Sequence, residues 1–265
     1  MVLSTTPYTD EVLAIAGTQL HLLKGGSGRP ALVLHGIEGP EGWLQLHDLL
    51  SQHATVYAPS HPGYGLSERP DWLESVTHMA YFYERFLRES RLEEVDLIGF
   101  GLGGWVAAEM AAMCSHNLAH LVLVDSAGIR PQAGETLDIF IRSWGDVVSS
   151  CVTDPEGAEE FRRIYDAEPI QAFGGRREAG RVTTMRMAYR PYMHSPALPA
   201  LLQGVTTPTL VVHGAEDRIV PVECSEAFAS AIPDAKLRIL DGCGHWPHFE
   251  RPDALAEAIL NFTRA

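Results

Sequence analysis

The chain has little that would anchor it in a membrane or cross-link it. The first residues, 1–7, contain neither a basic region nor an apolar run, so we expect no signal peptide, no transmembrane segment and a cytoplasmic protein. The four cysteines have no paired short spacing, which argues against a disulfide framework and against a zinc site. They are Cys114, Cys151, Cys224 and Cys243.

Positive charge is also scarce. The 265 residues include 20 Lys and Arg against 34 Asp and Glu, a net charge of −14 with histidine neutral. An acidic surface repels nucleic acid and anionic membranes, so we expect a small molecule as the partner, with the chain a monomer or a homodimer. Hydrophobic residues make up 46% of the chain, which is typical of a globular protein with one large core.

Short apolar runs alternate with helical patterns through most of the sequence. The runs suit strands that are buried on both faces, and the alternation predicts an α/β protein with a doubly wound, mostly parallel sheet. The expected strands are residues 11–16, 19–23, 31–35, 54–58, 95–98, 121–124, 209–213 and 236–240. The expected helices are residues 43–51, 73–89, 222–231 and 253–262.

The alternation of apolar runs and helical patterns stops between residues 128 and 204. No buried strand run occurs there, prolines are frequent, and helical patterns cover residues 137–148, 158–165 and 181–189. We interpret the segment as a helical lid inserted into a core that consists of residues 1–127 and 205–265.

Residues 96–109 read as a buried strand, a sharp turn and a helix. Glycines at Gly99, Gly101, Gly103 and Gly104 allow the strand and the helix to approach closely and permit unusual dihedral angles at the turn. The pattern resembles the nucleophile elbow of the α/β-hydrolase superfamily, Gly-x-Ser-x-Gly. Gly101 occupies the position where that family carries its serine.

Four further motifs occur in the order that this family requires, and the resemblance covers nearly the whole chain. They are His35-Gly36, the loop 61–67, the loop 214–221 with Asp217, and the loop 242–247 with His245. The resemblance implies that His245 is the base of a catalytic dyad and Asp217 its acid, with Asp125 as a second candidate for the acid. It also implies an oxyanion hole formed by the backbone N–H groups of Ile37 and Leu102.

Chemically, a neutral imidazole accepts a proton near pH 7, and a carboxylate on its other nitrogen fixes the tautomer. Replacing serine by glycine removes the nucleophile but leaves backbone donors in place. Cys243, Ser67 and Ser126 are alternative nucleophiles, each better explained by a structural role. No metal ligand spacing and no cofactor motif are present. Candidates for the pocket lining are His35, Trp105, Trp144, Tyr192 and Trp246.

Three kinds of function remain open. The chain is a hydrolase of esters, lactones or carbon–carbon bonds in which Gly101 replaces a serine, either naturally or by engineering. Alternatively, it is a serine-independent lyase, decarboxylase or isomerase with His245 as general base. The third hypothesis is a ligand-binding protein without catalytic activity. We favour an enzyme that acts on a small carbonyl, ester or carboxyl compound.

Overall fold

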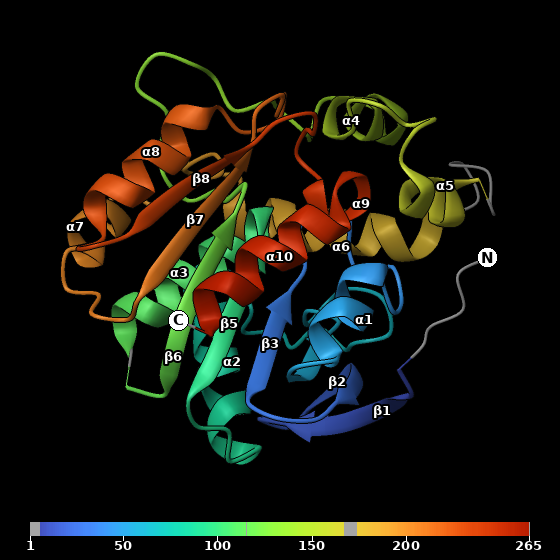
Figure 1. The fold of residues 1–265 in the computed structure, drawn as a ribbon, viewed down its shortest axis with the longest axis vertical. Coiled ribbons are helices and arrows are strands. Elements are labelled where there is room, and N and C mark those ends of the chain that lie inside the picture. The colour runs from blue at the N-terminus through green and yellow to red at the C-terminus, as the bar shows by residue number, and fades with distance from the viewer. Residues whose placement is uncertain (1–5, 115, 167–173, 265) are drawn as a thin grey trace.

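The protein is built around one eight-stranded sheet, seen in a computed structural model that describes residues 6–114, 116–166 and 174–264 (Figure 1). The strands are β1 (Tyr8–Ile15), β2 (Thr18–Gly26), β3 (Pro30–Leu34), β4 (Thr55–Pro59), β5 (Val95–Phe100), β6 (Leu118–Val124), β7 (Thr209–Gly214) and β8 (Lys236–Leu240). Their order in the sheet is β1-β2-β4-β3-β5-β6-β7-β8. Strands β3 to β8 pair in parallel, and β2 pairs antiparallel with both β1 and β4. The prediction of a doubly wound, mostly parallel sheet is confirmed.

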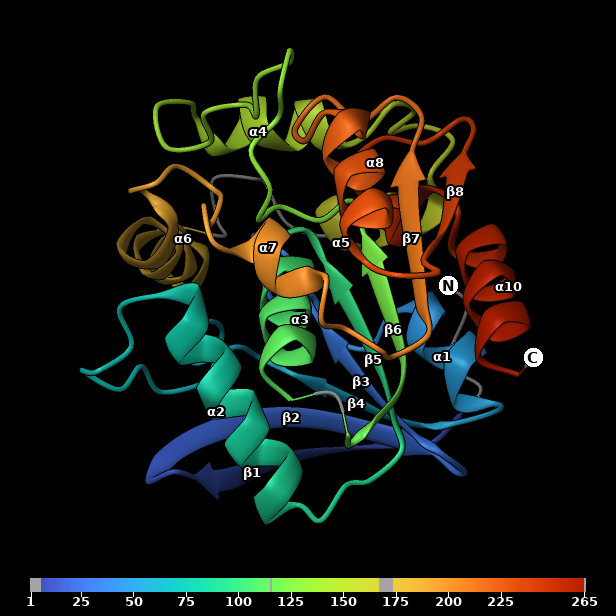
Figure 2. The same cartoon turned by 90° about the vertical axis from the view of Figure 1, so that its left-hand side faces the viewer.

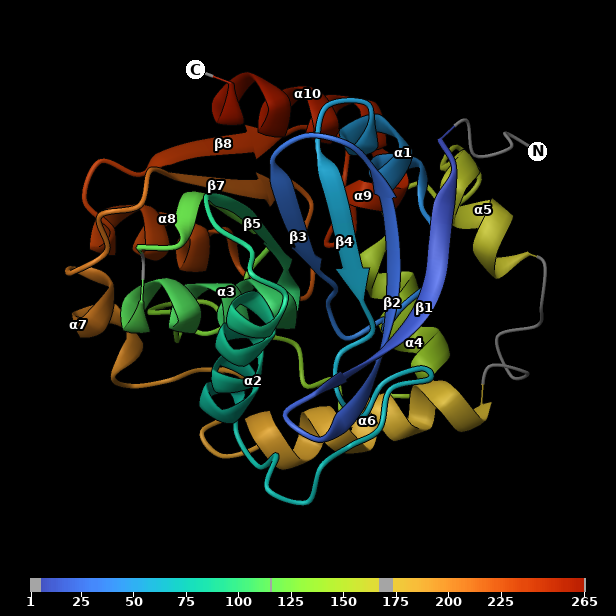
Figure 3. The ribbon, with the colours of Figure 1, turned by 90° about the horizontal axis from the view of Figure 1, so that it is seen from below.

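Helices cover both faces of the sheet (Figures 1 and 3). One face carries α2 (Val76–Glu89), α3 (Gly101–Met113), α7 (Leu198–Leu202) and α8 (Val222–Ala231). The other carries α1 (Gln45–Ser51) and α10 (Pro252–Thr263). The short helix α9 (Pro247–Glu250) follows the loop after β8.

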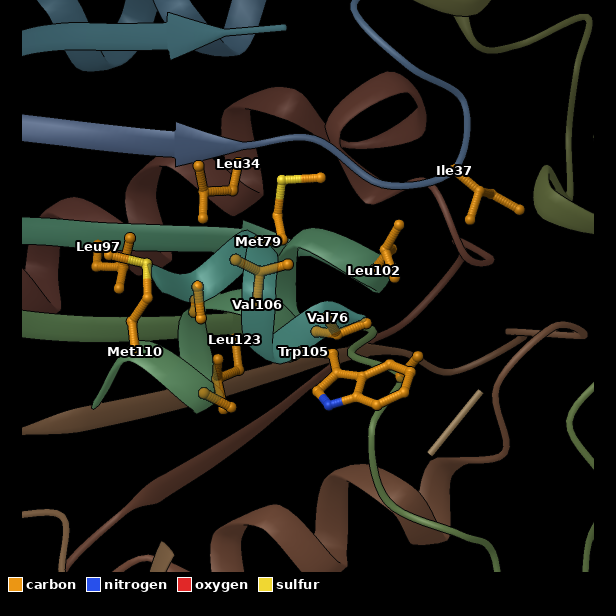
Figure 4. Close-up of a cluster of buried hydrophobic side chains, with 14 of the residues drawn as sticks. Leu34, Ile37, Val76, Met79, Leu97, Leu102, Trp105, Val106, Met110 and Leu123 are labelled. Carbon is orange, nitrogen blue, oxygen red and sulfur yellow. The ribbon is translucent and has the colours of Figure 1, made fainter. Parts of the chain in front are cut away.

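The sheet separates two apolar cores because side chains alternate across each strand. Leu34, Leu97 and Leu123 face α2 and α3, where they meet Met79, Val106 and Met110 (Figure 4). Their strand neighbours Val33, Ile98 and Val122 belong to the core under α1 and α10. All residues of β5 and β7 are buried, which explains why apolar residues dominate both strands in the sequence.

The turn between β5 and α3 depends on close backbone contact. A Cβ on Gly103 would overlap the carbonyl oxygens of Leu34 and His35, and a Cβ on Gly99 would overlap the carbonyl group of Gly103. Glycine at these positions therefore lets α3 begin directly above the end of the sheet.

We expect Gly103→Ala to lower the free energy of unfolding by about 1–3 kcal/mol, because backbone atoms have to move to admit the methyl group. Gly145→Ala is a matched control, since Gly145 also lies in the first turn of a helix but has only Ser143 Oγ nearby, at 3.8 Å. Urea unfolding of both variants measures the difference. Equal stability of the two would contradict the close approach at Gly103.

The described parts of the segment between β6 and β7 contain helices joined by loops, and no named strand. The segment contains α4 (Trp144–Cys151), α5 (Glu159–Tyr165), α6 (Gly174–Ala188) and α7. Figure 2 shows α4 beyond the carboxyl ends of β7 and β8. Residues 167–173 of the expected lid lie outside the described residues, as do residues 1–5 at the N-terminus.

The expected helix over residues 137–148 is wrong in its first half. The Asp138 side chain accepts hydrogen bonds from the N–H groups of Phe140 and Ile141, and Tyr192 holds the N–H of Ile139 at 2.9 Å. Helix α4 begins only after Ser143, whose Oγ accepts from the N–H of Asp146 at 3.2 Å.

Among the described residues, the helices are too short or too polar to cross a lipid bilayer.

Candidate functional site

The loops at the carboxyl ends of β3, β5, β7 and β8 converge on Gly101. This residue is the first of α3 and has φ +47°, in the left-handed region that favours glycine. A Cβ on Gly101 would lie 3.2 Å from His245 Nε2 and 3.8 Å from the Cα of Gly36. Gly101 and His245 therefore face each other across a space of about one side-chain atom.

His245 is held from behind by Asp217. Its Nδ1 lies 2.8 Å from Asp217 Oδ2, while Asp217 Oδ1 accepts the N–H groups of Ile219 at 2.7 Å and Val220 at 3.0 Å. Because the carboxylate can only accept here, the imidazole carries its proton on Nδ1 and turns the lone pair of Nε2 toward Gly101.

The charges around this pair favour an ionised carboxylate and a basic imidazole. Burial lowers the pKa of His245, but the negative charge of Asp217, its hydrogen bond and the charge of Glu38 together raise that pKa above the usual 6.5. Burial raises the pKa of Asp217, and His245 outweighs this and holds it below the usual 3.8.

Asp125, the second candidate for the acid, does not contact His245. Its Oδ1 accepts the N–H of Gly214 at 2.8 Å and lies 3.2 Å from Nδ1 of His213. Burial and the charge of Asp217 raise the pKa of Asp125 well above its usual value. Asp125, His213 and Asp217 also offer ligand atoms within 4.8 Å of one another, but a metal ion there would compete with the hydrogen bond to His245.

A small cavity of about 10 Å³ lies between Gly101 and His245. Ile37 and Leu102, the expected oxyanion donors, both line it, as do Tyr192 and five other residues of the segment between β6 and β7. Leu102 lies in the first turn of α3, where backbone N–H groups have no carbonyl partner within the helix. The arrangement thus combines a base, a helix N-terminus and room for about one water molecule.

A much larger cavity, of about 560 Å³, adjoins this space on the side of β3 and β4. His35 and Ile37 line it, and Ile37 also lines the small cavity, so the loop after β3 borders both volumes. The large cavity contains neither Gly101 nor His245. We therefore assign the reacting atoms to the small cavity and the room for a ligand to the large one.

Glu38 in this loop was missed at the level of the sequence. Its side chain is buried, and burial raises its pKa to about 7. The signal that could have found it is an acidic residue inside the Gly-Pro-rich stretch 36–42, directly after Ile37.

His35, a candidate for the pocket lining, has a structural role. Its Nε2 accepts the N–H of His61 at 2.9 Å, and burial lowers its pKa to about 4.

Of the aromatic candidates Trp105, Trp144, Tyr192 and Trp246, only Tyr192 lines one of the two cavities. Trp144 and Trp246 lie together with ring centroids 6.4 Å apart, and both indole nitrogens are buried without a partner among the described residues. Tyr192 reaches the small cavity while its hydroxyl donates to the Leu137 carbonyl. Trp105, however, lines neither cavity: it packs in the core under α3, and its indole donates to Glu109 at 3.2 Å (Figure 4).

The alternative nucleophiles make local contacts instead of reaching His245. The Cys243 thiol points to the Leu240 carbonyl at 3.4 Å, and burial raises its pKa to about 12. The Ser67 hydroxyl donates to the carbonyl of Ser60 at 2.8 Å. Ser126 is fully buried against α3, where a Cβ on Gly104 would overlap its hydroxyl group.

The fold and the loops that converge on Gly101 define the class of protein to which this chain belongs. The sequence profile of the Alpha/beta hydrolase family matches residues 31–258, and the chain belongs to that family. It is 26% identical over 270 residues to 2-hydroxy-6-oxo-6-(2'-aminophenyl)hexa-2,4-dienoic acid hydrolase of Metapseudomonas resinovorans, covering 98% of this chain and 92% of the relative. It is 28% identical over 289 residues to 2-hydroxymuconate semialdehyde hydrolase of a Pseudomonas species, covering 97% and 94%.

Solved structures agree on the fold. That of 2-hydroxy-6-oxo-6-phenylhexa-2,4-dienoate hydrolase from a Rhodococcus species superposes with a TM-score of 0.81. The match covers 98% of this chain and all of the other at 23% identity, so it supports the architecture alone.

Proposed function

We propose that this protein is a hydrolase that cleaves a bond next to a carbonyl group with a water molecule in place of a serine. The observation that carries the proposal is the position of His245 Nε2, which faces Gly101 across a space of one side-chain atom while Asp217 holds Nδ1 at 2.8 Å. In a site with a serine, the hydroxyl oxygen would occupy this space.

Water fits the space in size and in chemistry. A cavity of about 10 Å³ is close to the ~10–15 Å³ that one water needs, and His245 Nε2 supplies a hydrogen-bond acceptor. Proton transfer to that nitrogen turns the water into a nucleophile, and the charge of Asp217 stabilises the imidazolium that forms.

The reaction proceeds in two steps that balance. First, the water oxygen bonds to the carbonyl carbon, its proton moves to His245 Nε2, and the carbonyl oxygen becomes an oxyanion that accepts the N–H groups of Ile37 and Leu102. Next, the oxyanion re-forms the carbonyl, the neighbouring bond breaks with its electron pair on the leaving atom, and His245 returns the proton to that atom. The products are a carboxylic acid and a protonated leaving group.

The relatives support a carbon–carbon bond as the target. Those named above are hydrolases of 2-hydroxy-6-oxo-dienoic acids or of 2-hydroxymuconate semialdehyde, compounds in which a carbonyl lies at the end of a conjugated enol. Such a system accepts the electron pair of the broken bond. We extend to this chain the reaction class, which is hydrolysis at a ketone or ester carbonyl.

Residues 128–204 serve, in this proposal, as the lid over the site. Thr136, Leu137, Ile139, Tyr192 and Met193 come from this segment and line the small cavity with His245. A lid that encloses the reacting atoms limits competing water and strengthens the polar interactions around the oxyanion.

We expect the protein to hydrolyse 4-nitrophenyl acetate without a covalent intermediate. Stopped-flow traces should lack an acyl-enzyme burst, and a fluorophosphonate should add no mass to the protein, because no activated hydroxyl faces His245. In ¹⁸O-water the acid product should carry ¹⁸O, which an isomerisation or a decarboxylation would not introduce. Stoichiometric labelling of Ser67 or Ser126 would overturn the proposal.

A further inference from the structure

The large cavity beside the reacting atoms has the size of a ligand site. Its volume of about 560 Å³ lies within the ~300–1,000 Å³ that is typical of small-molecule pockets. It lies between the loop after β3, the ends of β2 and β4, and α9. Ile37 in the loop after β3 lines both this cavity and the small one.

Glu38 presents a buried oxygen that has no partner among the described residues. Its side chain is 4% exposed; Oε1 accepts the N–H of Gly36 at 2.7 Å, while Oε2 has no hydrogen bond. A Cβ on Gly36 would collide with this carboxyl group, so glycine at that position makes room for it. A buried carboxylate oxygen left unpaired is costly, and a ligand that donates a hydrogen bond would remove that cost.

His248 adds a second acceptor to the same cavity. It is 3% exposed, and Nε2 lies 3.8 Å from Glu38 Oε1. Burial, followed by the charge of His245, holds its pKa well below the usual 6.5, so the ring is neutral. A proton on Nε2, on the side of the Glu38 carboxylate, leaves the lone pair on Nδ1, and this nitrogen has no partner among the described residues.

The guanidinium group of Arg177, which lines the cavity, already has partners. Arg177 forms an ion pair with Glu41, in which the two side chains are 12% and 8% exposed, and its guanidinium lies over the ring of Tyr165, 4.6 Å from the centroid. A carboxylate ligand would therefore have to displace Glu41 and would also face Glu38. The balance of charge in the cavity disfavours an anion.

The remaining walls favour a cation. Tyr64, Phe100 and Phe249 line the cavity, and the faces of aromatic rings attract positive charge. The net charge of −14 adds a long-range attraction for cations.

We infer that this cavity binds the protonated amino group of a substrate, which donates hydrogen bonds to Glu38 Oε2 and His248 Nδ1. The substrate is thus an amine-bearing carbonyl compound with its ammonium end away from the bond that breaks. The assignment of the ligand to the substrate rests on the proposed function, but the binding preference does not.

Three probes with a phenyl ring and similar size test the preference without turnover: benzylamine, benzyl alcohol and benzoate. By isothermal titration, benzylamine should bind the protein most tightly and benzoate most weakly. Glu38→Gln retains an oxygen for the N–H of Gly36 but removes the charge, so it should weaken benzylamine about tenfold or more and leave benzyl alcohol nearly unchanged. A crystal structure of the benzylamine complex should show the nitrogen beside Glu38.

Glu84→Gln is the matched control. Glu84 lies in α2, away from both cavities, yet burial also raises its pKa to about 7, and its Oε1 is buried without a partner among the described residues. This variant should keep the preference for benzylamine. Tightest binding of benzoate, a preference that survives in Glu38→Gln, or no detectable binding of benzylamine would each overturn the inference.

The pH dependence gives a second readout. Benzylamine binding requires ionised Glu38, and burial raises the pKa of Glu38 to about 7, so affinity should rise about tenfold between pH 6 and pH 8. In Glu38→Gln, the affinity for benzylamine should no longer rise between pH 6 and pH 8, except for the part of the rise that comes from the deprotonation of His245. The charged and titratable groups that face Glu38 or share its cavity are His21, His35, Glu41, His47, Tyr64, Arg177, His245 and His248.

The proposed function and the ammonium site can each be wrong without the other. If benzylamine binds as expected but catalysis does not depend on His245, the proposed function is wrong and the ammonium site stands. If hydrolysis proceeds through water and benzoate binds best, the proposed function stands and the ammonium site is wrong.

Discussion

His245→Gln should reduce kcat/KM for hydrolysis by about 10²–10⁴-fold, the usual contribution of a general base. Glutamine keeps a polar group of similar reach but cannot accept and return a proton near neutral pH. The loss should fall mainly on kcat, because the residue touches the attacking water and not the remote end of the substrate. Steady-state kinetics with 4-nitrophenyl acetate measure it.

His120→Gln controls for the loss of a buried imidazole–carboxylate pair. His120 Nδ1 lies 2.7 Å from Asp96 Oδ1, a geometry like that of His245 and Asp217, but at the opposite end of the sheet. This variant should retain full turnover. Equal activity losses in both variants would point to folding instead of chemistry.

The pH profile identifies the base as well. Only the neutral imidazole accepts a proton, and the pKa of His245 is raised above 6.5 by Asp217 and Glu38 against the effect of burial. Activity should therefore rise with pH through a midpoint above 6.5 and lose that step in His245→Gln. A wild-type profile that is flat from pH 5 to pH 9 would contradict the role of His245.

The sheet and the meeting of Gly101, His245 and Asp217 were predictable because each depends on local signals. Apolar runs mark buried strands, and parallel strands bring their carboxyl ends to one edge, so loops in the correct order meet there. That His245 and Asp217 form a hydrogen bond follows from this topology.

Other features could not be predicted, because tertiary contacts decide them. In α3, nearly every side chain is buried, so no apolar face tells which way Trp105 points. Residues 137–143 carry a helical pattern, but the hydroxyl of Tyr192, more than 50 residues away, takes the N–H of Ile139. The burial of Glu38 likewise depends on α9, which follows about 200 residues later.

Gly101→Ser should convert the site to covalent catalysis while making the protein less stable. At φ +47° a residue with a Cβ is strained by about 1–3 kcal/mol. The Cβ would also lie 3.2 Å from His245 Nε2, so the imidazole has to yield by a few tenths of an ångström. The melting temperature should therefore fall, as measured by calorimetry.

The introduced hydroxyl would take the place of the attacking water beside His245. His245 would then remove its proton, and 4-nitrophenyl acetate should give an acyl-enzyme burst with an adduct of one acetyl group at Ser in position 101. Hydrolysis by the water route, without an adduct, should fall, because the oxygen of the side chain displaces the water.

Gly101→Ala separates the two effects. Alanine introduces the same Cβ and the same backbone strain without a hydroxyl group, so it should lower the melting temperature to a similar extent and form no adduct. An unchanged melting temperature in both variants, together with no adduct in Gly101→Ser, would mean that position 101 does not face His245 in solution. The water-based mechanism would then lose its central observation, because the space assigned to the water is defined by these two residues.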